Sequence, residues 1–195
     1  MIDQAMIIVR EGLRQFLRLK LNLDQVTEKV VLTSIINQQG EMTIPNNALG
    51  ITLYRVVEDR VSETEYRTSF QDSSSSNKRP PVILSLEFII TANFTEYTEG
   101  LKYLSAAIAF FQSQNYFDQT SNPLMPKEMA PFSVALLTQD TSEHNHTWSL
   151  FGSRYMPSVI YRLRSVPIQE DSITSIDDIV EQVDIQVLNQ QGNIS

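Results

Sequence analysis

Apolar side chains recur at helical spacing over the first sixteen residues of the chain. They step by three and four positions, which places them on one face of a helix: the members are Ile2, Met6, Val9, Leu13 and Phe16. On the other side Arg10, Arg14 and Arg18 follow one another at intervals of four and form a basic stripe. Such a stripe is typical of a solvated helix face, and the alternative is a contact with an acidic partner or a neighbouring subunit. We therefore treat these three arginines as candidate interface residues.

Short β-branched segments predict three strands in the middle of the chain. They are KVVLTSII at 29–36, ITLYRVVE at 51–58 and VILSLEFIITAN at 82–93. Asn93, with Glu96 three residues later, resembles a capping box, so we expect a long helix after the third strand. Residues 60–81 have no hydrophobic pattern and contain a run of four serines, which predicts a flexible loop within the domain.

Two further strands are predicted in the C-terminal half. One follows Pro131 with the sequence FSVALLTQD, and the other, residues 158–166, alternates apolar and polar side chains. Between them, the polar stretch TSEHNHTW predicts a surface segment. Trp148 and Tyr155 lie near a proline turn. Such residues are ordinarily core aromatics, and the alternative is that they anchor an interface.

Together these segments predict an α+β fold. We expect an antiparallel or mixed sheet of about five strands, with two long helices packed on one face. The 195 residues are enough for one domain with a core of its own. The predicted organisation is a domain over residues 1–169, which contains the flexible loop 60–81, followed by an acidic C-terminal arm at 170–195.

The arm holds most of the chain's excess negative charge. The chain has a net charge of −8, and six acidic residues lie in the arm without any Lys or Arg: Glu170, Asp171, Asp177, Asp178, Glu181 and Asp184. Within the arm Val183, Ile185 and Val187 alternate with polar residues, as in a strand. We expect these three residues to add a strand to an exposed sheet edge of a neighbouring subunit. The alternative is that the arm folds back on its own sheet.

Several classes of function find no support in the residues. The chain has no cysteine, no apolar run long enough to span a membrane and no dense basic surface for nucleic acid. His144 and His146 could share one face of a strand and reach a metal, but they are the only histidines, so a polar surface loop is the favoured interpretation. No glycine-rich phosphate loop or nucleophile motif is present. We therefore expect no enzyme activity, no metal and no cofactor.

Four stretches of the sequence together resemble one family. They are LNLDQV with the strand after it, NNALGITLYRVVEDR, the segment PPVILSLEFIITANFTEYTEGLKYLSAAIAFFQSQNYF, and TWSLFGSRYMPSVIYRLRSVPI. The family is that of the cap, or tube-terminator, proteins of extracellular contractile injection systems, which include the Photorhabdus virulence cassettes and the antifeeding prophages. The resemblance covers residues 1 to about 169. Its most specific part is the order and spacing of Trp148, Gly152, Tyr155, Pro157-Ser158 and Tyr161 to Arg164.

The resemblance implies a fold related to phage tail terminators and a structural role. Six copies of the chain are expected to form a ring that ends the inner tube and sheath, with the tube and sheath proteins as partners. The protein is then made in the bacterial cytoplasm and joins a particle that is released or attached to a membrane. Two alternatives stay open: a phage neck or tail-completion protein, and a soluble regulatory binding module.

Overall fold

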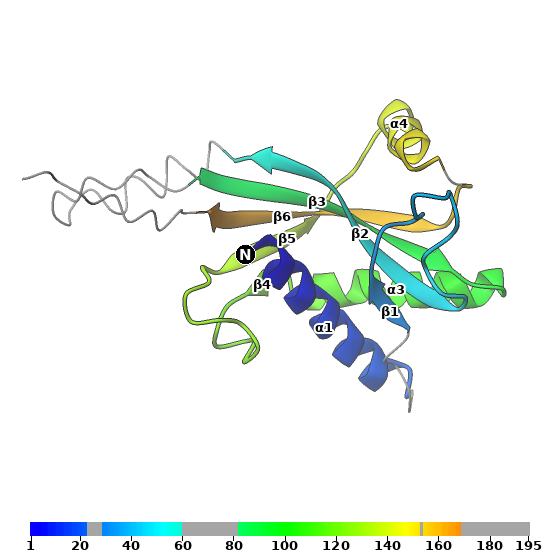
Figure 1. Cartoon of the computed structure of the whole chain (residues 1–195). Helices are drawn as coiled ribbons and strands as arrows, with labels where there is room; N and C mark the ends of the chain where they lie inside the picture. Colours follow the sequence, from blue (N-terminus) through cyan, green and yellow to red (C-terminus); the bar gives the residue numbers. More distant parts are fainter. Residues whose placement is uncertain (23–28, 60–81, 153, 169–195) are drawn as a thin grey trace, which may run out of the picture.

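A six-stranded mixed sheet with helices on both faces forms the described part of the protein (Figure 1). The computed structural model describes residues 1–22, 29–59, 82–152 and 154–168. In chain order the elements are α1 (Ile2–Lys20), β1 (Val30–Leu32), β2 (Ala48–Glu58), β3 (Val82–Asn93), α3 (Tyr97–Ser113), β4 (Tyr116–Phe117), β5 (Phe132–Leu136), α4 (Thr141–Phe151) and β6 (Ser158–Ile168). The predicted α+β class is confirmed, and the sheet has one short strand more than the expected number because β4 contributes two residues.

The strands lie in the order β1-β2-β3-β6-β5-β4. Only β1 and β2 run parallel, and the other neighbours are antiparallel. The central strand, β3, is twelve residues long and pairs along most of its length with β2 on one side and β6 on the other. Phe88 in β3 therefore lies opposite Leu53 on one neighbour and Tyr161 on the other.

The two long helices, α1 and α3, cover one face of the sheet, as predicted (Figure 1). Aromatic rings form the middle of this core: Phe88 lies 5.7 Å from Tyr161 and 6.1 Å from Phe111 between ring centroids. Each fully buried ring of this kind stabilises the fold by about 1.5–3 kcal/mol. The helical stripe predicted for the N-terminus packs here, and Met6, Val9 and Leu13 are buried.

A third helix, α4, covers the other face of the sheet, where only a polar surface segment was predicted. Asp140 caps this helix: its carboxylate accepts a hydrogen bond from the Glu143 amide at 2.8 Å, and the Glu143 carboxylate accepts one from the Asp140 amide at 3.1 Å. Gly152 ends the helix in the left-handed region at φ 59°. Trp148 and Phe151 then pack over Ile89 and Ile160 of the sheet.

The predicted capping box at Asn93 is wrong. Asn93 is the last residue of β3, and its side-chain amide donates to the carbonyl oxygens of Ile44 and Pro45 at 2.7 and 3.2 Å. Helix α3 starts four residues later, and its N-cap, Glu96, makes no side-chain capping bond. The asparagine thus ties the end of β3 to the segment before β2 instead of capping a helix.

Two predicted segments, the loop 60–81 and the arm 170–195, lie outside the described residues. Among the residues that are described, no helix combines the length and the apolar character that a membrane crossing requires.

The close approach of α1 and α3 depends on Gly12. Glycine in a helix interior costs about 1 kcal/mol relative to alanine, so its presence here needs a packing reason. A Cβ at this position would lie 2.9 Å from the ring carbon Cζ of Phe110, a side chain of α3 that is almost fully buried. The ring cannot move away without disturbing Phe16, 5.5 Å from it, and Phe117, 6.3 Å from it.

We therefore expect Gly12→Ala to destabilise the protein although alanine is the better helix former. Overpacking of a filled core costs about 1–3 kcal/mol, which exceeds the gain in helix propensity. Thermal and denaturant unfolding measure the difference. Gln15→Ala, an exposed change in the same helix, is the control and should leave stability within about 0.5 kcal/mol. A Gly12→Ala protein more stable than the parent would contradict the packing argument.

Candidate functional site

A buried glutamate joins the three central strands on the face that α4 partly covers. The Glu87 side chain of β3 is 1% exposed. Its Oε1 accepts hydrogen bonds from Nε and Nη2 of Arg162 in β6 at 3.1 and 2.7 Å, and its Oε2 lies 3.4 Å from Nη1 of Arg55 in β2. Since Arg55, Glu87 and Arg162 are cross-strand neighbours, the register of the sheet brings them together.

The network extends from Glu87 towards α4. The Tyr54 hydroxyl donates to Oε2 of Glu87 at 3.2 Å and accepts from the Gln139 side chain at 3.3 Å. The same Gln139 amide donates to the Thr147 hydroxyl at 3.1 Å. Burial, together with the negative charge of Glu87, raises the pKa of Tyr54 far above its ordinary value. The phenol therefore stays a hydrogen-bond donor over the whole physiological range.

This network is suited to holding strands together rather than to acid–base chemistry. Two N–H groups of Arg162 donate to one carboxylate oxygen of Glu87, and such charge-assisted hydrogen bonds belong to the stronger class. Arg55, Glu87 and Arg162 border a polar depression of about 300 Å³ that also includes Ser85 and Arg164. In the described part of the chain, no group of three or more His, Asp or Glu side chains could hold a metal ion.

The two histidines lie on a helix, where the sequence favoured a polar surface loop and a strand was the alternative. His144 and His146 are two positions apart in α4, so they do not share a face, and the geometry required for a shared metal is lost. His144 instead packs edge-on against Tyr155, with the ring centroids 5.7 Å apart.

The two candidate aromatic residues have different environments. Trp148 is 7% exposed and packs against Phe151 and Tyr155, with ring centroids 5.9 and 5.4 Å away. Its indole Nε1 is buried and has no hydrogen-bond partner among the described residues. Tyr155 is 66% exposed, and Leu150 in the last turn of α4 is 78% exposed. Of the two candidates, only Tyr155 has a largely exposed side chain.

The basic stripe on α1 is partly neutralised within its own helix. Glu11, which is nearly buried, forms ion pairs with Nη2 of Arg10 at 2.6 Å and with Nη2 of Arg14 at 2.7 Å. Arg18 is exposed and forms no ion pair with any described residue. The stripe therefore offers its positive charge mainly at the C-terminal end of α1, next to Lys20.

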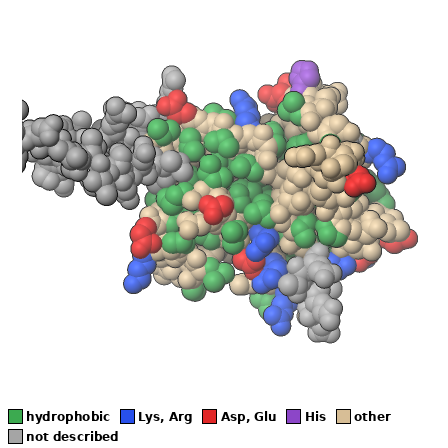
Figure 2. Space-filling model, viewed as in Figure 1, with side chains coloured by type: hydrophobic (Ala, Val, Ile, Leu, Met, Phe, Trp, Pro, Cys, Tyr) green, Lys and Arg blue, Asp and Glu red, His purple; other side chains and the backbone are tan. Residues whose placement is uncertain are grey.

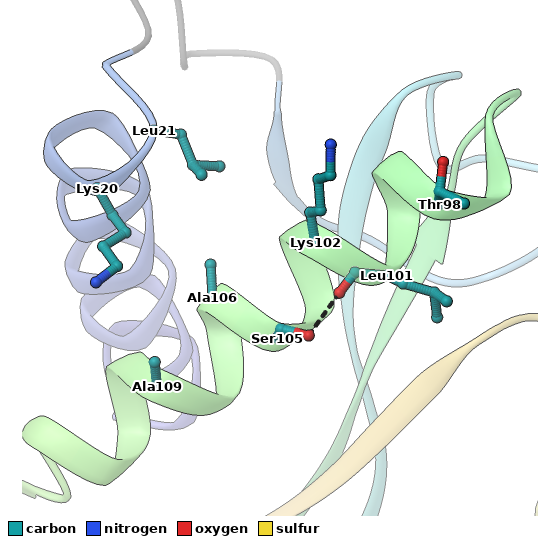
Figure 3. Close-up of a pocket in the computed structure, with 8 residues that line it drawn as sticks. All are labelled: Lys20, Leu21, Thr98, Leu101, Lys102, Ser105, Ala106 and Ala109. Atoms are coloured by element: carbon teal, nitrogen blue, oxygen red, sulfur yellow. Dashed lines mark hydrogen bonds between the residues drawn. The ribbon is translucent and has the colours of Figure 1, made fainter.

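A groove lies beside that end, between α1 and α3 (Figure 3). It has a volume of about 410 Å³. Its lining combines two lysines with small and apolar side chains: Lys20, Leu21, Thr98, Leu101, Lys102, Ser105, Ala106 and Ala109. Figure 3 shows the small side chains of Ala106 and Ala109 on the part of α3 beside α1. It carries no group positioned for chemistry and is a surface feature of the helix pair.

The remaining interface candidates, Val183, Ile185 and Val187, lie outside the described residues. Sequence reasoning missed Glu87, Tyr54 and Gln139. The alternation of β3 marks Glu87 as a charged residue on a strand, but only the three-dimensional register pairs it with an arginine 75 positions away.

Comparison with known proteins identifies a family and a fold. The family model described as the Pvc16 N-terminal domain matches residues 8–182. A solved structure of the PVC sheath/tube terminator of an extracellular contractile injection system, in the extended state, is 15% identical with a TM-score of 0.51, over 97% of this chain and 65% of that one. The anti-feeding prophage cap is 14% identical with a TM-score of 0.44, over 90% of this chain and 60% of that one. The chain thus spans less than two thirds of the length of either structure. No curated protein matches it.

We expect Glu87→Gln to destabilise the fold. The amide keeps the shape but removes the charge that Arg162 and Arg55 share, and hydrogen bonds to charged groups contribute about 1.5–3 kcal/mol. Because the Arg162 side chain is 31% exposed, solvent screens part of this interaction energy. We therefore expect the free energy of unfolding to fall by about 1–2 kcal/mol. Chemical unfolding measures the free energy of unfolding of both Glu87→Gln and the control Glu128→Gln, whose side chain is exposed. Equal stability of the two variants would show that the pairing contributes nothing net.

Proposed function

This chain belongs to the family of the Pvc16 N-terminal domain, and from that premise we propose that it is the cap that ends the tube and sheath of an extracellular contractile injection system. The family match carries the proposal, because it covers residues 8–182. The likeness of the fold to a sheath/tube terminator supports it independently of sequence identity. The role requires matching surfaces and no catalytic residue or cofactor.

The cap that we propose is a ring of six copies. In a head-to-tail ring each subunit contacts its neighbours through two different surfaces. The described residues include exposed apolar side chains on three elements: Ile7 and Leu19 on α1, Tyr97 and Leu101 on α3, and Leu150 on α4, with Tyr155 after it. A specific interface buries at least about 1,000 Å² in total, which surfaces of this kind can supply.

The partners in this proposal are the last tube and sheath subunits of the same particle. The chain is made in the bacterial cytoplasm, where the particle is assembled, and then leaves with the particle or stays attached to a membrane with it. Neither nucleic acid nor a membrane span enters the role, in keeping with the net charge of −8.

Purified chain should stop the growth of its particle's tube and sheath. With tube and sheath proteins alone we expect polymers of broadly distributed length, because nothing closes the growing end. Addition of the chain should narrow the distribution and leave one ring at one end of each polymer in electron micrographs. Polymers of unchanged length, with no ring at either end at a saturating concentration of the chain, would contradict the proposed function.

A charge introduced at the end of α4 should weaken assembly without affecting the stability of the fold. We expect Leu150→Asp to keep the melting temperature within about 2 °C, since the side chain is 78% exposed, while weakening ring formation or docking at least tenfold. Trp148→Ala should instead lower stability by about 3–5 kcal/mol, because it empties a core position. Analytical ultracentrifugation measures ring formation, and thermal melts measure stability. Ser149→Asp, exposed on the same helix, is the matched control. Normal assembly of Leu150→Asp would exclude this surface from the ring.

A further inference from the structure

The groove between α1 and α3 carries positive charge on both of its walls. Lys20 belongs to α1 and Lys102 to α3, and neither forms an ion pair with a described residue. None of the described lining residues has a carboxylate, and Glu99 in the first turn of α3 is not among them. Figure 2 shows Lys and Arg side chains gathered around the C-terminal end of α1, where the groove lies. An occupant with an acidic group therefore complements the groove.

Three side chains of α3 form a row along this groove. Lys102, Ser105 and Ala109 are three and four positions apart, so they share one face of the helix, and all three are exposed. The Ser105 hydroxyl donates to the carbonyl oxygen of Leu101 at 2.8 Å, so its proton is already used within the helix (Figure 3). This α3 row thus presents an ammonium group followed by two small side chains, over which a second helix has room to pack.

Helix α4 carries a row with the same spacing and complementary chemistry. Glu143, His146 and Leu150 are also three and four positions apart, and all three are exposed, Leu150 at 78%. Trp148 of the same helix is buried against the sheet, so this α4 row points away from the fold. The α4 row begins with a carboxylate where the α3 row begins with an ammonium group, and it ends with a large apolar side chain where the α3 row ends with a methyl group.

We propose that the α4 row of one copy docks on the α3 row of the next copy, with the two helices parallel. This inference rests on the proposed function, since it names a contact between neighbouring subunits of the ring. In this arrangement Glu143 lies beside Lys102, and Leu150 covers Ala109 in the groove. Antiparallel packing would instead place Leu150 on Lys102 and leave the carboxylate over Ala109.

The carboxylate of Glu143 is able to serve two partners. It accepts one hydrogen bond, from the Asp140 amide at 3.1 Å, and a carboxylate has about four acceptor positions. An exposed ion pair contributes little affinity, so Leu150 supplies most of it, and the pair with Lys102 sets the direction of the helix.

The two rows lie on opposite sides of the sheet, which makes the contact head-to-tail. Helix α3 packs on the face that contains Phe88, and α4 covers Ile89 on the other face (Figure 1). Each copy therefore uses its α4 towards one neighbour and its groove towards the other. Contacts between two different surfaces of this kind close into rings, whereas a contact between identical surfaces gives a dimer.

Disulfide trapping tests the contact directly, because the chain has no cysteine of its own. Full-length Leu150→Cys and Ala109→Cys proteins are mixed and oxidised mildly, with the tube and sheath proteins of the particle present so that a ring that needs a template also forms. Packed helices whose axes are about 8–10 Å apart bring facing Cα atoms to roughly 5 Å, within disulfide range. We expect a covalent heterodimer from this mixture, and another from His146→Cys with Ser105→Cys.

The control for trapping is Asn145→Cys, which is exposed on α4 but lies off the row. With Ala109→Cys it should cross-link at least fivefold less than Leu150→Cys does. A mixture of Leu150→Cys with Lys102→Cys tests the antiparallel arrangement, and we expect it to cross-link at least fivefold less as well.

The ion pair is tested by coupling between two substitutions. We expect Lys102→Ala and Glu143→Gln each to weaken ring formation about two- to fivefold in analytical ultracentrifugation, and the double variant to be no weaker than the weaker single one. Glutamine also serves in a capping box, so the melting temperature of Glu143→Gln should stay close to that of the parent. Lys127→Ala, an exposed change outside the groove, is the matched control and should leave ring formation unchanged. Additive losses in the double variant would contradict the pairing.

Electron micrographs of the polymer ends separate this inference from the proposed function. Rings at the ends without either expected cross-link overturn the helix contact and leave the cap intact. Preferred trapping of Leu150→Cys by Lys102→Cys overturns the parallel arrangement and with it the proposal. Cross-linked heterodimers without rings support the contact and count against the cap, and the absence of both contradicts both.

Discussion

Strand β3 has to be covered on both faces, and the rest of the architecture follows from that requirement. Its residues from Ser85 to Ala92 are all buried, so consecutive side chains point into two different environments. On one side Leu86, Phe88 and Ile90 need the apolar cover of α1 and α3. On the other side Ile89 packs against Trp148 of α4.

The same constraint explains the polar network. A carboxylate at a position that is 1% exposed is stable only with charged and hydrogen-bonding partners around it. Arg162, Arg55 and Tyr54 supply them from the two strands that flank β3. Glu87 thus makes the pairing of the three central strands specific: a shift of either neighbour by one residue would turn its arginine to the wrong face.

Periodicity was a good guide to the fold where apolar residues are dense, as in α1 and in the alternating part of β6. It failed for α4, because one buried and one partly buried aromatic residue, Trp148 and Phe151, do not form a helical stripe. Asp140 and Glu143 nevertheless have the spacing of a capping box. At Asn93 the capping signal gave a wrong prediction. Its side-chain amide donates to the carbonyl oxygen of Ile44 and does not cap a helix. At the candidate surfaces, sequence reasoning selected Trp148 and Tyr155 together, whereas the fold buries one and exposes the other. The ion pair between Glu11 and Arg14 follows i,i+3 helical spacing and could have been predicted, whereas the one between Glu11 and the adjacent Arg10 could not.

The chain belongs to the family of the Pvc16 N-terminal domain, and the role that we propose for it is to form part of the closed end of a contractile particle. A cryo-electron microscopy map of the end of the particle tests this most directly. Our account predicts a six-fold ring of this chain on the last layer of tube and sheath, with the helix pair and α4 of each copy against neighbouring subunits. A particle end closed by another protein, with this chain absent from it, would contradict the account.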